Sequence, residues 1–262
     1  MRIRVINPNT TWSMTRVIGE CASAVAPPGV TVEAVSPSMG PASIESHYDE
    51  ALAVPGILAE IARGEAEGVD RYVIACFGDP GLEAARELAR GPVVGIAEAG
   101  MRAATYLGRS FSVVTTLART RGRAWDLAAT YGVERSCRGV HACEIPVLEL
   151  ETSPDVQERI TQACREALAL DESDVIVLGC AGMADLCAHI SEVIGAPVVD
   201  GVAAAVVTVE GLVRLGLRTS RINEYAAPPA KAYTGLLAQF QLGGRTSRTR
   251  ILSAVSSPPT EG

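Results

Sequence analysis

A chain of 262 residues is long enough for one large domain or for two of about 100–150 residues each. Hydrophobic residues make up 48% of it and charged residues 20%, so it can bury a sizeable core, which excludes an intrinsically disordered polypeptide. The 23 basic and 30 acidic residues give a net charge of −7, which argues against nucleic acid as a partner because phosphate binding needs a basic face.

Short β-branched runs alternate with longer Ala-rich segments along the chain. The runs that read as strands are apolar throughout, as in a parallel sheet covered on both faces, and lie at residues 3–6, 30–35, 72–75, 92–96, 111–115, 175–178 and 197–199. Helical patterns lie at residues 13–25, 50–66, 81–89, 98–107, 119–131, 154–170, 183–194 and 201–215. Thr11, Asp79 and Ser153 stand where they would cap the helices that follow them. This alternation predicts an α/β fold of the doubly wound type.

An internal repeat divides the chain. The residues that align without a gap are Asp70 with Asp174, Cys76 with Cys180, Gly78 with Gly182, and Leu82 with Leu186. After one inserted residue, Pro92-Val93-Val94 matches Pro197-Val198-Val199. The repeat predicts two pseudo-symmetric parallel-sheet lobes with the active site in the cleft between them. We expect residues 1–97 and 204–240 in the first lobe, residues 98–203 in the second, and a disordered tail at 241–262.

Neither the first residues nor any apolar run indicates a membrane or a secretory route. The first residues, MRIRVINPNT, contain no apolar stretch of signal-peptide length. No run reaches the roughly 18 apolar residues of a membrane span. We therefore expect a cytoplasmic protein with no membrane partner.

The seven cysteines are odd in number and widely spaced, and none forms a Cys-x-x-Cys pair. They indicate neither a disulfide framework nor a zinc site. The three histidines are also too far apart for a local metal motif, so we expect no bound metal. We expect five of the cysteines only to pack: Cys21, Cys137, Cys143, Cys164 and Cys187.

Cys76 and Cys180 differ from the other five because they occupy equivalent places in the repeat. Each follows an apolar strand and precedes a glycine-containing turn that opens a helix, which is the sheet edge where ligands bind. Amides at a helix N-terminus would stabilise a thiolate and lower its pKa from the ordinary value of about 8.5. For either cysteine taken alone, packing in the core is the alternative interpretation. Their equivalent positions in the repeat favour a catalytic role instead.

Two thiols on opposite sides of a cleft suit a two-base reaction at a carbon acid. One thiolate removes a proton, and the opposite thiol returns a proton to the other face, so that the stereocentre is inverted without a cofactor. Amides around Phe77-Gly78 and Ala181-Gly182 would supply an oxyanion site for the charge that develops.

Seven motifs, which span the chain to about residue 215, connect it to a known family: INPNT (6–10), GPASIESHYDEALAVPGIL (40–58), ACFGDPGLEAARE (75–87), VVGIAEA (93–99), VVTTL (113–117), LGCAGM (178–183) and PVVDGV (197–202). In this order they resemble the hydantoin and allantoin racemase group of the aspartate/glutamate racemase superfamily. The resemblance implies an isomerase without a cofactor that uses Cys76 and Cys180 as its acid/base residues. It also implies a homo-oligomer and substrate contacts from Asn9, Phe77, Gly78, Thr115, Thr116, Ala181 and Gly182.

The turns after the two cysteines bear on the substrate. Amino-acid racemases of this superfamily typically carry Cys-Asn-Thr and Cys-Thr-His, whereas this chain has Cys76-Phe77-Gly78 and Cys180-Ala181-Gly182. These turns suit a neutral cyclic ureide better than a zwitterion. We therefore expect a racemase of 5-substituted hydantoins, with allantoin as the main competing substrate. An aspartate/glutamate-type racemase is a weaker alternative, and so is an arylmalonate-type decarboxylase, which would keep only one catalytic cysteine.

Several binding residues have a second interpretation that the sequence leaves open. Asn9 is equally a turn or helix-capping residue, and Thr115 and Thr116 are equally caps at a strand end. Residues 40–50 are either a surface loop that leads into a helix or a loop over the cleft. In the second case Ile44 or Tyr48 would meet the substituent of the substrate.

Overall fold

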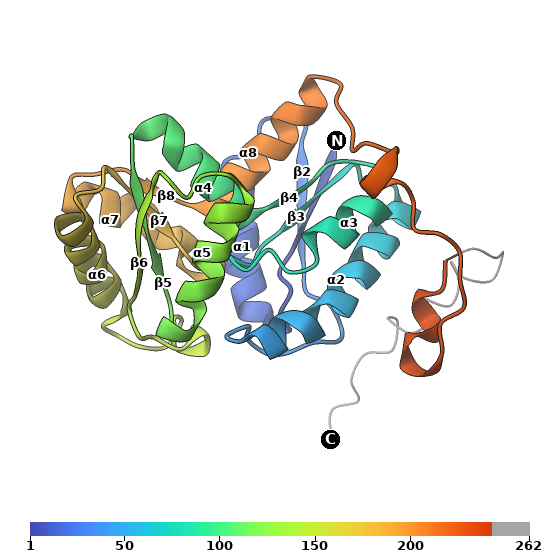
Figure 1. Ribbon diagram of the computed structural model, residues 1–262, viewed down its shortest axis with the longest axis horizontal. Helices are drawn as coiled ribbons and strands as arrows, with labels where there is room; N and C mark the ends of the chain where they lie inside the picture. The colour runs from blue at the N-terminus through green and yellow to red at the C-terminus, as the bar shows by residue number, and fades with distance from the viewer. Residues whose placement is uncertain (243–262) are drawn as a thin grey trace.

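Two parallel sheets lie in two lobes side by side, as Figure 1 shows for the computed structural model, which describes residues 1–242. The first sheet has the strand order β2-β1-β3-β4. Its strands are β1 (Arg2–Ile6), β2 (Thr31–Val35), β3 (Arg71–Ile74) and β4 (Val93–Gly95). The second sheet has the order β6-β5-β7-β8, with β5 (Phe111–Thr115), β6 (Cys137–Ala142), β7 (Val175–Leu178) and β8 (Val198–Val199).

The helices follow the strands in the expected alternation. They are α1 (Trp12–Ala24), α2 (His47–Glu67), α3 (Leu82–Leu88), α4 (Ile96–Leu107), α5 (Arg121–Thr130), α6 (Val156–Asp171), α7 (Cys187–Ile194) and α8 (Gly201–Arg214). Short 3-10 turns are η1 (Ala118–Thr120), η2 (Val147–Glu149), η3 (Ala181–Leu186), η4 (Asn223–Tyr225) and η5 (Gly235–Phe240). The predicted α/β fold with two parallel-sheet lobes is confirmed.

The two sheets repeat one another in strand order and in local hydrogen bonding. Asp70 Oδ2 accepts a hydrogen bond from the backbone N–H of Arg2 at 2.7 Å, at the start of β1. Asp174 Oδ2 does the same for Arg109 and Ser110 at 2.9 and 3.0 Å, just before β5. The aspartate pair of the sequence repeat therefore fixes the loop that precedes β3 or β7 to the start of the neighbouring strand in each half.

Alternating side chains of the strands divide the core into three layers. Ile3 and Val5 of β1 face α1 and belong to a central core, which also holds Val175 and Val177 of β7 together with residues of α4, α5 and α8. Ile6 faces the opposite side, where α2 and α3 cover the first sheet. Helices α6 and α7 cover the outer face of the second sheet in the same way. Each sheet thus has helices on both faces, and the two halves share the central core.

The boundaries predicted for the lobes, at residues 97–98 and 203–204, stay a prediction. Helices α4 and α8 lie at these boundaries and pack on each other within the shared core. After α8 the chain returns to the first half, where the Thr219 hydroxyl donates to the carbonyl oxygen of Gly91 at 2.8 Å. Arg221 donates to the carbonyl oxygen of Glu87 at 2.9 Å. Of the predicted tail at 241–262, residues 243–262 lie outside the described part of the chain.

Strand β6 has no counterpart among the strands predicted from the sequence. Its residues, CRGVHA, mix Gly139 with the polar Arg138 and His141, so they show no continuous apolar run. The segment is an edge strand that pairs in parallel with β5 along one side only. Backbone pairing with β5, which no local pattern reveals, therefore determines this strand.

The capping predicted for Asp79 and Ser153 is wrong. Asp79 has a φ of 45° and caps a helix further along the chain, because its carboxylate accepts from the N–H groups of Ala97 and Glu98 in α4 at 3.1 and 2.9 Å. The N-cap position of α6 is Asp155, not Ser153. Thr11 does hold the N-cap position of α1, but its hydroxyl donates to the carbonyl oxygen of Ala42 at 2.7 Å instead of capping the helix.

None of the helices within residues 1–242 combines the length and the hydropathy that a membrane-spanning helix requires.

Candidate active site

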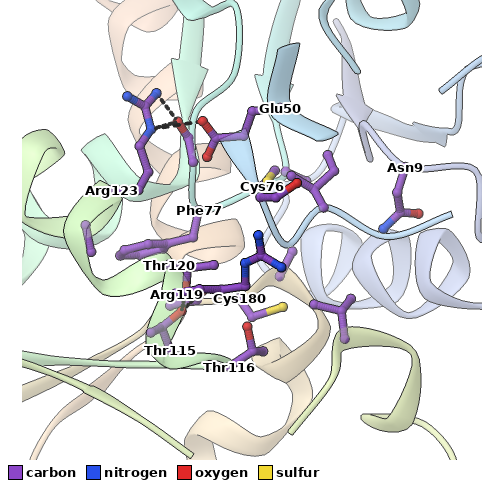
Figure 2. Close-up of a pocket in the computed structure, with 18 of the residues that line it drawn as sticks. Asn9, Glu50, Cys76, Phe77, Thr115, Thr116, Arg119, Thr120, Arg123 and Cys180 are labelled. Carbon is purple, nitrogen blue, oxygen red and sulfur yellow. Dashed lines mark hydrogen bonds and ion pairs between the residues drawn. The ribbon is translucent and has the colours of Figure 1, made fainter. Parts of the chain in front are cut away.

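A cavity of about 170 Å³ lies where the carboxyl ends of the two sheets meet (Figure 2). Residues that follow β1, β3, β5 and β7 form most of its wall: Asn7, Asn9, Ala75, Cys76, Phe77, Gly78, Thr115, Thr116, Gly179, Cys180 and Ala181. The remaining wall comes from α1, from the loop before α2, from the first turn of α2, and from η1, α5 and η2. This is the sheet edge at which open α/β folds bind ligands.

Cys76 and Cys180 both line this cavity, one from each half of the molecule. Each lies two residues beyond the end of its strand, since β3 ends at Ile74 and β7 ends at Leu178. Both side chains are partly exposed to the cavity, and the described cysteines include no disulfide. The structure therefore brings the two predicted catalytic thiols together in one site.

Burial controls the ionisation of both thiols. It raises the pKa of Cys180 to about 11, and it raises the pKa of Cys76 well above its ordinary value. The backbone amides of Gly78 and Gly182 act in the opposite direction on their respective sulfurs, but their effect is smaller. The lowered pKa expected from the sequence is therefore wrong in direction, because desolvation of the thiolate outweighs the helix N-terminal amides.

The two thiols also oppose each other's ionisation. A charge on Cys180 raises the pKa of Cys76, as do the carboxylates of Glu50 and Asp79. Like charges in a shared site disfavour the state in which both groups are ionised. The arrangement therefore favours one thiolate and one thiol over two thiolates.

An ion pair between the halves lies beside Cys76. Helix α2 begins after Ser46, whose hydroxyl accepts from the N–H of Asp49 at 3.2 Å, and its first turn carries Glu50 into the cavity wall. Arg123 of α5 lies with its Nε 3.3 Å from Glu50 Oε2. Its Nε and Nη2 also donate to the carbonyl oxygen of Gly78 at 3.1 and 2.6 Å, as the dashed lines in Figure 2 mark.

This ion pair explains the glycine in the turn after Cys76. A Cβ atom at position 78 would lie 2.3 Å from Glu50 Oε1, a distance that real Cβ atoms essentially never show. Burial raises the pKa of Glu50, while the positive charges of Arg123 and His47 lower it. Gly78 therefore makes room for a half-buried carboxylate beside the sulfur of Cys76.

Asn9 lines the cavity and also holds a turn. Its Oδ1 accepts from the N–H of Thr11 and from Nδ2 of Asn7, both at 2.9 Å, and its Nδ2 lies 3.3 Å from the sulfur of Met14. Asn9 thus has the position expected of a substrate contact and also the role of a turn residue. Its carboxamide oxygen is committed to the start of α1.

Thr115 and Thr116 take different roles at the end of β5. The hydroxyl of Thr115 donates to the carbonyl oxygen of Gly179 at 3.3 Å and lies 3.1 Å from the hydroxyl of Thr120. Thr116 accepts from the N–H of Ile145 with its backbone carbonyl at 3.1 Å, and its hydroxyl has no partner among residues 1–242. In Figure 2 that hydroxyl points toward Cys180. Thr116 is therefore free to contact a ligand, whereas Thr115 joins β5 to β7.

The loop before α2 closes one side of the cavity. Ile44 is in the wall, and Glu45 Oε1 accepts from the N–H of Val147 in the other half at 2.7 Å. Tyr48 is exposed and lies outside the wall. The interpretation as a loop over the cleft therefore fits Ile44 and not Tyr48.

Two sets of residues differ from the predicted site. Gly182 is not in the wall, because it packs against Leu150 and Met14, although its amide faces Cys180. Sequence reasoning missed the wall residues Asn7, Met14, Ser46, His47, Glu50, Ala75, Arg119, Thr120, Arg123, Ala124, Val147 and Gly179. Most lie on helices or turns, where a polar residue has the pattern of a solvent-exposed face, and the repeat marks only the strand ends.

No group of three or more His, Cys, Asp or Glu side chains within residues 1–242 is arranged to hold a metal ion. The side chains of the wall offer two thiols, one carboxylate, two guanidinium groups and one imidazole.

Comparison with known proteins gives one consistent family. A profile of the Asp/Glu/Hydantoin racemase family matches residues 3–209. A hydantoin racemase from Rhizobium meliloti is 50% identical over 236 residues, which cover 90% of this chain and 98% of that protein. A hydantoin racemase from Pseudomonas sp. (strain NS671) is 45% identical over 250 residues, which cover 95% and 99% of the two chains.

The solved structures include an allantoin racemase from Klebsiella pneumoniae. It superposes with a TM-score of 0.89 at 50% sequence identity and covers 91% of this chain and 98% of its own. Racemases are isomerases. The chain is therefore an isomerase that belongs to the Asp/Glu/Hydantoin racemase family, within the group formed by hydantoin and allantoin racemases.

Proposed function

We propose that this protein racemises 5-substituted hydantoins by a two-cysteine, two-base proton transfer at C5, without a cofactor. The observation that carries the proposal is the placement of Cys76 and Cys180. They lie at equivalent strand ends of two repeated halves and line one cavity of about 170 Å³. The hydantoin racemases among its relatives, at 45% and 50% identity, support the substrate class.

The reaction follows from the acidity of the C5 proton, which lies next to the C4 carbonyl group. The thiolate on one face takes this proton, and the electron pair of the C5–H bond is delocalised onto the C4 oxygen as an enolate. The thiol on the other face then donates its proton to C5, which re-forms the C4 carbonyl and inverts the centre. The two sulfurs have exchanged protonation states, so the same pair serves the reverse reaction.

The raised pKa values suit this exchange. A thiolate in a desolvated site is a stronger base than an exposed thiolate, and the opposing thiol stays protonated and ready to donate. The amides of Gly78 and Gly182 moderate the cost of forming each thiolate. The site thus keeps one base and one acid on the two faces.

Allantoin, a hydantoin with a 5-ureido group, is the second candidate substrate. The allantoin racemase from Klebsiella pneumoniae is as similar in sequence to this chain, at 50% identity, as the hydantoin racemase from Rhizobium meliloti. The cavity wall offers the polar groups of Glu50 and Arg119 as well as the apolar groups of Ile44 and Phe77. A ureido substituent would use the polar part of this wall and an alkyl or aryl substituent the apolar part.

Solvent exchange and optical activity test the proposal together. Each enantiomer of 5-benzylhydantoin and of allantoin is incubated with enzyme treated with a chelator in deuterium oxide. We expect each enantiomer to lose optical activity, which chiral chromatography measures. We also expect it to gain deuterium at C5, which mass spectrometry measures. Racemisation of neither compound would contradict the proposed substrate class, and loss of activity on chelation would contradict catalysis without a metal cofactor.

A further inference from the structure

We propose that Arg119 binds the hydantoin ring of the substrate and stabilises the negative charge that develops on its C4 oxygen. This inference rests on the proposed function, because it names a further substrate-contacting residue for the same proton transfer.

Arg119 is a cation of the cavity wall that no protein group neutralises. It belongs to η1, the turn that follows the end of β5, and its side chain is exposed to the cavity. It forms no hydrogen bond or ion pair with any residue in the described range 1–242, whereas its backbone is fixed. In Figure 2 its guanidinium points into the space between Cys76 and Cys180.

The other basic side chains of the wall already have a partner. Arg123 binds the Gly78 carbonyl oxygen and the Glu50 carboxylate, and His47 Nδ1 lies 4.0 Å from the same carboxylate. Within the part of the chain that the structure describes, Arg119 is thus the cation of this wall that remains available to a ligand.

The amides expected to form the oxyanion site are also partly committed. The N–H groups of Gly78 and Gly182 act on the sulfurs of Cys76 and Cys180. They serve the thiolates and are not directed at a ring oxygen. A different donor for the enolate is therefore needed, and a guanidinium supplies two parallel N–H donors and a permanent positive charge.

The backbone of η1 holds Arg119 in place without using its guanidinium. The N–H of Ala118 donates to Glu144 Oε1 at 2.9 Å. The hydroxyl of Thr120 donates to the carbonyl oxygen of Leu117 at 2.8 Å and lies 3.1 Å from that of Thr115. Preorganised donors cost little reorganisation at the moment when charge develops.

The position between the two thiols suits both directions of the reaction. One negative charge moves from a sulfur to the ring and then to the opposite sulfur, while the carboxylate of Glu50 stays nearby. A cation between the sulfurs remains close to this moving charge throughout. Because the guanidinium stabilises the negative charge on the ring, it lowers the barrier for proton transfer in either direction.

Three variants test the role of Arg119: Arg119→Met, Arg119→Lys and Arg119→Ala. The control is Arg135→Met, since Arg135 is an exposed arginine of the same half that lies outside the cavity wall. We expect Arg119→Met to lower kcat about 100-fold with a smaller change in KM, the loss typical of an oxyanion donor. Arg119→Lys should recover part of this loss, and the control should match the wild type.

Chemical rescue separates a role in the reaction from a role in folding. Guanidinium ion at concentrations well below denaturing should raise the activity of Arg119→Ala and leave that of the wild type unchanged. The two substrates share the hydantoin ring and differ in the 5-substituent. If Arg119 contacts the ring, its replacement should lower kcat by a similar factor for 5-benzylhydantoin and for allantoin. A loss confined to allantoin, or kcat within about threefold of the wild type in Arg119→Met, would overturn the inference. Failure of the wild type on both substrates would instead count against the proposed function.

Discussion

Arg123, in the second half of the molecule, donates two hydrogen bonds to the carbonyl oxygen of Gly78 in the first half, at 3.1 and 2.6 Å. Gly78 lies two residues after Cys76, and its amide acts on that sulfur. The contact therefore connects the docking of the two halves to the residue whose amide faces the sulfur of Cys76. The ion pair of Arg123 with Glu50 reinforces it at 3.3 Å.

Replacing Arg123 by methionine should lower kcat/KM for racemisation by about tenfold, because one hydrogen bond to a charged group is worth about 1.5–3 kcal/mol. The variant leaves both the Gly78 carbonyl oxygen and the Glu50 carboxylate without this partner. Steady-state kinetics of Arg123→Met measure the effect. Arg165→Met is the control, since Arg165 is an exposed residue of α6, and equal kinetics of the two variants would contradict the coupling.

Single substitutions of the two catalytic thiols should separate proton exchange from inversion. Cys76→Ser and Cys180→Ser should each abolish racemisation, because the acid or the base of the pair is lost. In deuterium oxide, each variant should still exchange the C5 proton of the one enantiomer that presents it to the remaining thiol, without inversion. Chiral chromatography with mass spectrometry detects this outcome.

The remaining cysteines give the matched controls. Cys143→Ser is the strictest, because Cys143 lies near enough to Cys180 to raise its pKa but is outside the cavity wall. We expect little change in this variant and in the serine variants of Cys21, Cys137 and Cys164. Cys187 packs in the core below the turn after Cys180 and is less suited as a control. Full racemase activity in Cys180→Ser would contradict the two-base mechanism.

Most of the fold could be predicted because its signals are local. Continuous apolar runs mark strands that are buried on both faces, and the repeat marks Cys76 and Cys180 at strand ends. Strand β6 lacked such a run, since Arg138 and Gly139 interrupt it, and it forms by pairing with β5. Elements that depend on pairing across the chain are not visible in a short window of sequence.

The site shows the same division between local and distant causes. Asn9 and Thr116 were predicted from the family resemblance, whereas Glu50 and Arg123 reach the cavity only because α2 and α5 dock from different halves. Asp79 was assigned to the helix beside it, but its carboxylate caps α4 instead. The pKa direction of the thiols was missed for a related reason, because burial depends on the complete fold and not on the turn.

The raised thiol pKa values make the activity depend on pH in a definite direction. The productive enzyme carries one thiolate, and burial raises the pKa of Cys180 to about 11, so the thiolate is a minor form at about pH 7. We expect kcat/KM to rise about tenfold per pH unit from about pH 7 to about pH 10, after subtraction of the uncatalysed rate. A flat profile across this range would show that a group of much lower pKa acts as the base.

Buried aspartates make the stability depend on pH in the opposite direction. Burial raises the pKa of Asp79 to about 6, although the hydroxyl of Tyr131, at 2.6 Å, and the amides of α4 lower it. The unfolded chain releases this proton at about pH 4, so between about pH 4 and about pH 6 the native state binds more protons than the unfolded state. The stability that the protonated group contributes is complete below about pH 4 and is lost as the pH rises through about 6.

The free energy of unfolding should therefore fall from about pH 4 to about pH 6 by an amount on the order of 2–3 kcal/mol for Asp79. Asp79→Asn removes this part of the slope but keeps some slope from Asp200, whose pKa burial also raises to about 6. The variant should be less stable at every pH, because an amide nitrogen cannot accept from the α4 amides. Denaturant titrations at several pH values measure this, with the exposed Asp126→Asn as the control. Parallel stability curves for Asp79→Asn and the wild type would show that Asp79 stays ionised in the folded protein.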